Sequence, residues 1–151
     1  MKIIETGIRI GFSFCGDISI VETSTGPRSI PPANRRQGLV YPTEPWPSRH
    51  GLLYLCSFEG QTSKDTVCWK MRDKRIEPAD ARILLLLTEC TPDNLIGQQV
   101  AAPLYSYRPA QIGGPVLPVC KLSKPTAELF SISEVGMPAD ILFLGYTFLI
   151  F

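Results

Sequence analysis

The chain has 151 residues, of which 44% are hydrophobic and only 19% charged, and its formal net charge is +1 at pH 7. A chain of this length forms one domain that buries roughly two thirds of its unfolded surface. The near-neutral charge argues against a general nucleic-acid-binding protein, whose affinity comes from many phosphate contacts. A charged fraction below the roughly 25% of an average soluble domain favours a protein that buries part of its surface against copies of itself or a partner.

The first five residues lack the apolar run and cleavage site of a secretory signal peptide, so we expect a cytoplasmic protein. Five cysteines are widely spaced in apolar stretches, at positions 15, 56, 68, 90 and 120. Without a secretory signal, such cysteines are predicted to be buried thiols that pack like small hydrophobic residues. The apolar stretch at 141–151 is shorter than the about 20 residues of a membrane-spanning helix, so no membrane span is expected.

Alternating apolar residues predict strands in the first part of the chain. In residues 7–21, every second residue from Ile8 to Phe14 is apolar, so these side chains would fall on one face of an extended chain. This alternation with a period of two is typical of a half-buried strand. A Gly-Asp pair at 16–17 interrupts the pattern and predicts either a hairpin or one strand with a bulge. Residues 52–58 and 66–72 flank a turn-rich segment and predict an antiparallel hairpin, across which Cys56 and Cys68 would meet.

The segment 23–51 has a different character. It holds six of the fourteen prolines and four arginines against one glutamate, a local charge excess of +3. Because each proline removes a backbone donor, regular strands are not expected here. Long loops in compact domains are commonly functional or draped over a partner, and this segment is therefore predicted to be an extended arm.

Strand signals resume in the second half of the chain. Residues 83–87 form an apolar run too short for periodicity to decide between strand and helix, and the flanking strands favour a strand. The sequence Thr-Pro-Asp-Asn at 91–94 predicts a short helix with Thr91 as N-cap, ended by Gly97. After a second proline-rich segment at 103–118, residues 116–122 and 129–135 are predicted strands.

The last eleven residues, 141–151, carry no charge and are rich in β-branched and aromatic side chains. They predict a central strand that is buried on both faces. Seven or eight short strands between Pro/Gly turns predict an all-β fold, as an antiparallel β-sandwich or jelly-roll-like barrel with long proline-rich loops and at most one or two short helices. We expect a single domain over residues 1–151, with 23–51 as its arm.

Motifs for catalysis are sparse. His50 is the only histidine, and a Cys/His enzyme would pair it with Cys15 or Cys56, with Asp17 orienting the imidazole. The apolar run around Cys56 argues against a Cys56–His50 pair, because burial in apolar surroundings raises the pKa of a thiol and lowers its reactivity. No CxxC, HxxxH or closely spaced acid pair occurs, nor any glycine-rich phosphate loop, so neither a metal nor a cofactor is expected.

Arginines and aromatic residues share the two proline-rich segments. Arginine forks and aromatic rings bind phosphates and bases, but they are also the residue types enriched at protein contacts. The candidate ligand- or partner-binding residues are Arg35, Arg36, Tyr41, Trp46, Arg49, Tyr105, Tyr107 and Arg108.

We therefore predict a non-enzymatic assembly or interaction protein that forms a homo-oligomer, with Arg35, Tyr41 and Trp46 as contact residues. A viral or phage structural or accessory protein, in the virion or the host cytoplasm, is the expected setting. The alternative is a small binding module for an anionic ligand, a nucleotide or nucleic acid, held by the arginine and aromatic loops. A Cys/His enzyme is the third hypothesis.

Overall fold

The computed structural model describes residues 1–12, 20–23, 26–28, 49–80, 83–84, 87–88, 91–104, 115–124 and 127–148. An α-helix, α1 (Lys64–Asp73), and a 3₁₀ helix, η2 (Asp93–Leu95), accompany one sheet. The described strands of this sheet are β1 (Lys2–Phe12), β2 (Ile20–Thr23), β3 (Gly26–Arg28), β4 (Arg49–Ser57), β5 (Glu77–Pro78), β6 (Gln99–Ala101), β7 (Val116–Lys121), β8 (Glu128–Ser133) and β9 (Ile141–Phe148).

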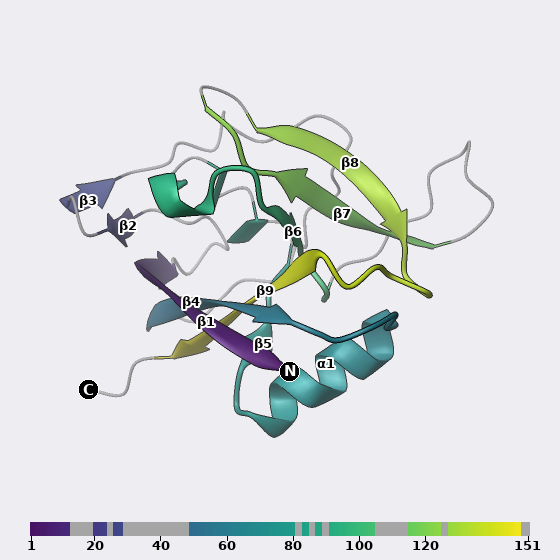
Figure 1. The fold of residues 1–151 in the computed structure, drawn as a ribbon. Helices are drawn as coiled ribbons and strands as arrows, with labels where there is room; N and C mark the ends of the chain where they lie inside the picture. Colours follow the sequence, from purple (N-terminus) through teal and green to yellow (C-terminus); the bar gives the residue numbers. More distant parts are fainter. Residues whose placement is uncertain are drawn as a thin grey trace.

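The sheet is open and mixed (Figure 1). Its order is β3-β2-β1-β4-β9-β6-β7-β8, and β5 pairs with β9 on the same side as β6. The β6–β9 pair is parallel, whereas the other strand pairs are antiparallel. The prediction of an all-β fold is confirmed. A second sheet, as a sandwich would require, is not found among the described residues, so the sandwich or jelly-roll form of the prediction is not confirmed.

Strand β9 lies at the centre of the sheet, as the uncharged C-terminal sequence predicts. It pairs with β4 along one edge, and with β6 and then β5 along the other. Its first five residues, from Ile141 to Gly145, are all buried. Because successive side chains of a strand point to opposite faces, β9 contributes to a hydrophobic core on each side of the sheet. Residues 149–151 of the predicted strand lie outside the described part.

Two cores cover the two faces of the sheet. The α1-side core consists of Cys56, Phe58, Val67, Met71, Ile76, Ala101, Leu117, Val119, Met137, Ile141 and Phe143. The opposite core includes Ile8, Leu53, Leu55, Ala79, Ile83, Leu84, Leu87, Leu95, Val100, Cys120, Leu122, Leu142 and Leu144. The sheet is therefore the middle layer, with α1 on one face (Figure 1) and the segment around residues 79–95 on the other.

The N-terminal strands β1 and β2 pair in antiparallel register, as a hairpin and not as one bulged strand, and the turn predicted at 16–17 lies outside the described residues. A β-bulge also occurs earlier in β1. Glu5 pairs with Tyr54 and Arg9 pairs with Leu52, so four residues of β1 span the same length as two residues of β4. The Thr6 hydroxyl stabilises this bulge, because Oγ1 donates to the Leu53 carbonyl at 2.8 Å and accepts from the Ile8 N–H at 3.1 Å. The bulge keeps both Ile4 and Ile8 on the opposite core.

Part of the expected arm is strand. The prediction that 23–51 lacks regular strands is wrong at residue 23, which ends β2, at 26–28, which form β3, and at 49–51, which begin β4. Pro27 lies in β3, which is an edge strand among the described strands, and edge strands are where proline is tolerated in a sheet. Residues 29–48 of the arm lie outside the described part of the structure.

Residues 66–72 are helical, so the prediction of a return strand there is wrong. Their buried residues, Val67, Cys68 and Met71, follow the helical spacing i, i+1 and i+4 and pack on the sheet. The helical spacing of these buried side chains is therefore a better indicator of the structure here than the turn-rich segment that precedes them. Cys56 and Cys68 accordingly lie on β4 and α1, not across a hairpin.

The favoured strand at 83–87 is also wrong for the residues that the structure describes there. Ile83, Leu84 and Leu87 have helical backbone and are fully buried in the opposite core. The short helix predicted after residue 91 is confirmed as η2, although Thr91 is not its cap. The Thr91 hydroxyl instead donates backwards to the Leu87 carbonyl at 3.1 Å, so it closes the preceding turn.

The strands predicted at 52–58, 116–122 and 129–135 are confirmed as β4, β7 and β8. An ion pair of 2.6 Å between Lys124 Nζ and Asp93 Oδ1 joins the β7–β8 connection to η2 and lowers the pKa of that carboxyl. Among the described residues, no helix is long and apolar enough to cross a membrane.

Candidate functional site

The eight predicted binding residues are not brought together by the described part of the structure. Seven of them, Arg35, Arg36, Tyr41, Trp46, Tyr105, Tyr107 and Arg108, lie outside the described residues. Arg49 begins β4, opposite Phe12, and only its backbone is described. The predicted loop site for a partner or an anionic ligand therefore stays a prediction.

The Cys/His hypothesis can be tested at one of its two candidate thiols, Cys56, and burial can also be compared at Cys68. Cys56 is fully buried in the α1-side core, and this burial raises the pKa of its thiol to about 11. Burial also raises the pKa of Cys68, although the positive charges of Arg72 and Lys64 oppose the shift. Cys15 and Asp17 lie outside the described residues, and only the backbone of His50 is described. Neither Cys56 nor Cys68 is therefore poised as a nucleophile.

Cys56 is expected to react with iodoacetamide at least about 100-fold more slowly in the native protein than in the urea-unfolded chain. With a pKa of about 11, about one thiol in a thousand is ionised at pH 8, and burial further limits access. Whatever native reaction occurs should accelerate about tenfold per pH unit between pH 7 and 9. Peptide mass spectrometry after timed alkylation measures each cysteine separately, and a native Cys56 rate equal to the unfolded rate would contradict the expected burial.

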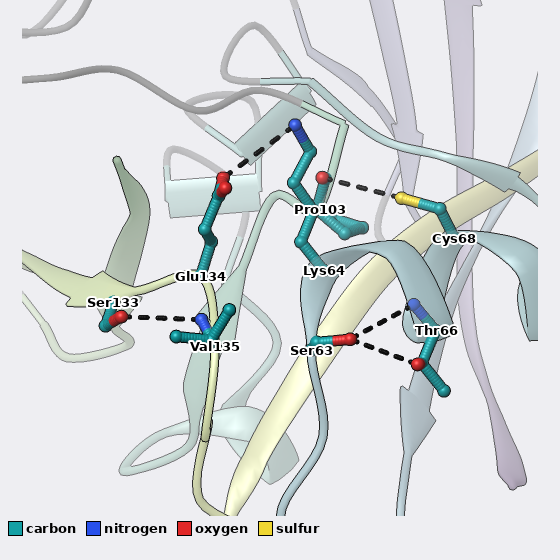
Figure 2. Close-up of polar contacts among 8 residues, drawn as sticks. All are labelled: Ser63, Lys64, Thr66, Cys68, Pro103, Ser133, Glu134 and Val135. Atoms are coloured by element: carbon teal, nitrogen blue, oxygen red, sulfur yellow. Dashed lines mark hydrogen bonds and ion pairs between the residues drawn. The ribbon is translucent and has the colours of Figure 1, made fainter. Parts of the chain in front are cut away.

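Metal binding finds no support in the described residues, where no group of three or more His, Cys, Asp or Glu side chains is placed to hold an ion. The described free thiols, Cys56, Cys68 and Cys120, are each buried on separate elements. Cys68 Sγ lies 3.6 Å from the Pro103 carbonyl oxygen, to which it donates a weak hydrogen bond (Figure 2). This contact ties α1 to the segment that follows β6.

Helix α1 begins at a well-formed cap. The Ser63 hydroxyl accepts a hydrogen bond from the Thr66 N–H at 3.4 Å and donates to the Thr66 hydroxyl at 3.0 Å (Figure 2). Asp65 in the first turn and Lys70 and Arg72 in the last complement the helix dipole. These local signals explain why residues 64–73 form a helix although they include valine, cysteine and tryptophan, whose helix propensities are low.

The start of α1 is also fixed to the connection between β8 and β9. The Lys64 N–H donates to the Glu134 carbonyl at 2.8 Å, and Thr62 and Met137 exchange two backbone hydrogen bonds. Glu134 Oε2 is buried, accepts no hydrogen bond among the described residues and lies 4.0 Å from Lys64 Nζ, whose charge therefore compensates it (Figure 2). The helix is held rigidly at this end.

The C-terminal end of α1 is a Schellman turn. The Ile76 N–H donates to the Met71 carbonyl at 3.0 Å, and the Arg75 N–H to the Arg72 carbonyl at 2.9 Å. Arg75 occupies the left-handed position with φ 60°, where glycine is the usual residue. The side chains of Met71 and Ile76 both enter the α1-side core, which fixes the direction of the chain into β5.

Arg75→Gly is expected to raise the free energy of unfolding by about 0.5 to 1 kcal/mol. An L-residue in the left-handed region is strained by about 1 to 2 kcal/mol, and the extra freedom of glycine in the unfolded chain offsets part of the gain. Urea unfolding followed by far-UV circular dichroism measures the change. Arg75→Ala keeps the strained backbone and serves as the control, so an equal gain in both variants would contradict this explanation.

The outer side of α1 carries an exposed tryptophan. The Trp69 side chain is 68% exposed, and it is surrounded by the exposed residues Asp65, Thr66, Arg72 and Asp73. We call this five-residue surface the Trp69 face. Lys70 lies beside it, with Nζ 5.8 Å from the centre of the Phe58 ring. A tryptophan side chain this exposed on a helix is unusual, because tryptophan is highly buried on average.

Sequence reasoning missed the Trp69 face because residues 66–72 were assigned to a strand. The signal was nevertheless present, in the Ser63 cap and in the helical spacing of Val67, Cys68 and Met71. A helix with those three residues inward necessarily turns Trp69 outward, because residue 69 is 100° or more from each of them around the axis.

No family model matches the chain, and neither a curated protein nor a solved structure matches it. Function is therefore inferred from the residues of the chain itself.

Proposed function

We propose that this chain is a non-enzymatic interaction protein that forms a homo-oligomer, and that the Trp69 face is its contact surface. The observation that carries the proposal is the 68% exposure of the Trp69 side chain on a helix that is capped and anchored at both ends. Tryptophan and arginine are enriched at the centres of protein interfaces, and a polar rim around one large apolar side chain is their common arrangement.

In the described part of the structure, α1 covers the sheet without the exposed indole. Val67 and Met71 already cover the sheet from the inner side of α1, and both are fully buried. A tryptophan buries about 150 to 250 Å² when it is covered, so covering the exposed part of Trp69 would contribute about 3 kcal/mol per subunit. Two covered indoles would contribute about 6 kcal/mol, which is comparable with the lower end of the about 4 to 15 kcal/mol that association costs, so the polar contacts around the indoles must contribute as well.

Thiol chemistry also supports the non-enzymatic assignment, because the raised pKa values of Cys56 and Cys68 disfavour a thiolate at neutral pH. The alternative function, binding of an anionic ligand by the arginine and aromatic loops, depends on residues outside the described part of the structure. It predicts thermal stabilisation by nucleotides or sugar phosphates, since a ligand of the native state raises its apparent stability.

Light scattering behind size exclusion tests the proposal, with loading concentrations from about 5 μM to 1 mM. We expect the mass per particle to exceed 16.7 kDa and to rise with concentration. Trp69→Ala should shift the association to at least about tenfold higher concentration, because it removes the anchor.

Ile96→Ala is the matched control. Ile96 is also an exposed apolar residue, but it follows η2, whose Leu95 belongs to the opposite core. A wild-type chain that stays at 16.7 kDa throughout the range would overturn the proposal of a homo-oligomer. An oligomer that responds equally to Trp69→Ala and Ile96→Ala would overturn the choice of the Trp69 face.

A further inference from the structure

We infer that two copies of the chain associate through α1, packed antiparallel about a two-fold axis that passes between their Trp69 side chains. This inference rests on the proposed self-association and specifies its geometry. It follows from the way in which charged and polar residues are distributed around Trp69 on the Trp69 face.

The polar residues of the Trp69 face form two stripes. Asp65 and Arg72 are seven residues apart, which is close to two helical turns, so they lie on one flank of Trp69. Thr66 and Asp73 have the same spacing and lie on the other flank. All four side chains are exposed, so each stripe is open to a second molecule.

A two-fold axis between antiparallel helices brings each stripe against the same stripe of the second copy, in reverse order. Asp65 lies about 6 Å before Trp69 along the axis, and Arg72 about 4.5 Å after it, at 1.5 Å per residue. After reversal, Asp65 is level with Arg72 of the second copy to within about 1.5 Å. Two symmetric carboxylate–guanidinium pairs therefore flank the paired indoles.

The second stripe is complementary in the same way. Reversal brings the Thr66 hydroxyl, which can donate, level with the Asp73 carboxylate of the second copy. A parallel pair, about an axis along the helices, would instead bring each stripe against the other stripe, with Asp65 level with Thr66 and Arg72 level with Asp73 of the second copy. It would also bring like ends of the two helix dipoles together, which disfavours it. The complementary stripes thus point to a second copy as the occupant, and the helix dipoles favour the antiparallel direction.

The neighbouring charges are compatible with this pairing. Arg72 Nε lies 3.8 Å from Glu77 Oε2 in the same chain, and both side chains are about half exposed. A guanidinium has five N–H donors, so it can hold Glu77 and a second carboxylate together. Lys70 is directed over the Phe58 ring, and Lys74 and Arg75 follow the last turn of α1, outside both stripes.

The expected dimer is weak. A single pair of helices buries less than the about 1,200 Å² of stable complexes, and small interfaces of this kind belong to transient associations. We therefore expect a dissociation constant of roughly 100 μM and a monomer–dimer equilibrium that is visible in sedimentation velocity between about 5 μM and 1 mM.

Charge reversal on one stripe gives the decisive test. Asp65→Lys and Arg72→Glu should each raise the dissociation constant at least about tenfold, because each variant faces two like-charged pairs in its own dimer. An equimolar mixture of the two variants should recover dimerisation to within about threefold of the wild type. In the mixed dimer, position 65 of either chain again faces an opposite charge at position 72 of the other.

Lys74→Glu is the control, since it reverses an exposed charge that lies outside both stripes. Thermal melting of each variant checks that the fold is retained. Recovery in the mixture supports the two-fold geometry, because a contact between two different surfaces of the chain would not be restored by mixing.

Three results would overturn the inference. If the wild type dimerises and both single variants dimerise equally well, the contact lies elsewhere, although self-association itself stands. If both variants are weakened and their mixture stays weak, the stripes do not face each other. A wild type that remains monomeric overturns the proposed homo-oligomer, and this geometry with it.

Discussion

Gly145→Ala is expected to lower the free energy of unfolding by about 3 kcal/mol, although it adds only one methyl group. A Cβ on residue 145 would lie 2.5 Å from Ile76 Cγ2 and 3.0 Å from the Glu77 carbonyl oxygen, and would also overlap Met71 Cε. The Met71 methyl is the end of a flexible chain and can move. Ile76 is branched at Cβ, and Glu77 is held by the pairing of β5 with β9, so these two cannot move freely.

Gly145 therefore allows the C-terminal turn of α1 and strand β5 to lie directly on the central strand. Urea unfolding of Gly145→Ala should show a lower midpoint with an unchanged slope. Gly60→Ala is the control, because it also replaces a glycine but meets no atom within 4 Å, and its positive φ of 71° predicts a loss of only about 1 kcal/mol.

The double variant Gly145→Ala, Ile76→Leu tests the steric cause. Leucine moves the branch from Cβ to Cγ and so removes the methyl group nearest to residue 145. The double variant should lose less stability than the sum of the two single variants, because the two residues share one contact. Strict additivity would show that the overlap with Ile76 does not determine the effect.

Phe143→Ala is expected to lower the free energy of unfolding by about 4 kcal/mol. The Phe143 side chain is 1% exposed at the centre of the α1-side core, on the strand that both β4 and β6 flank. Its ring packs edge-to-face on Phe58 at 5.6 Å between centroids. Truncation removes this contact and leaves a cavity between α1 and the sheet that rigid strands cannot close.

A loss of this size is a large part of the 5 to 15 kcal/mol that stabilises a typical domain. Phe130→Ala makes the same substitution on the edge strand β8, where the ring is 38% exposed, and should cost less than about 1.5 kcal/mol. Equal losses in Phe143→Ala and Phe130→Ala would contradict the central position of β9.

The strands could be predicted where apolar residues either alternate or run unbroken. Strand β9 is the clearest case, because its uncharged sequence requires burial on both faces, and the structure places it between β4 and β6. Strand β7 follows for the same reason, since its first five residues are buried. The order of the strands in the sheet, and the parallel β6–β9 pair, depend on long-range contacts that no local pattern encodes.

The errors occurred where a short apolar run fits both secondary structures. Residues 66–72 alternate well enough for a strand, but the Ser63 cap and the inward side of Val67, Cys68 and Met71 make them a helix. This single misassignment hid the Trp69 face. Seven of the eight predicted binding residues, in the arm and in the segment 103–118, lie outside the described residues, so the loop site stays a prediction.

The central claim is that Trp69 is covered when two copies of the chain meet. The chain has two tryptophans, Trp46 and Trp69, so 5-fluorotryptophan labelling gives two fluorine resonances, which the Trp46→Phe variant assigns. We expect the Trp69 resonance to shift with protein concentration along the same curve as the mass from light scattering, because its indole leaves water on dimerisation. A rising mass with a stationary Trp69 resonance, above all if the Trp46 resonance moves instead, would contradict the assignment of the contact to α1.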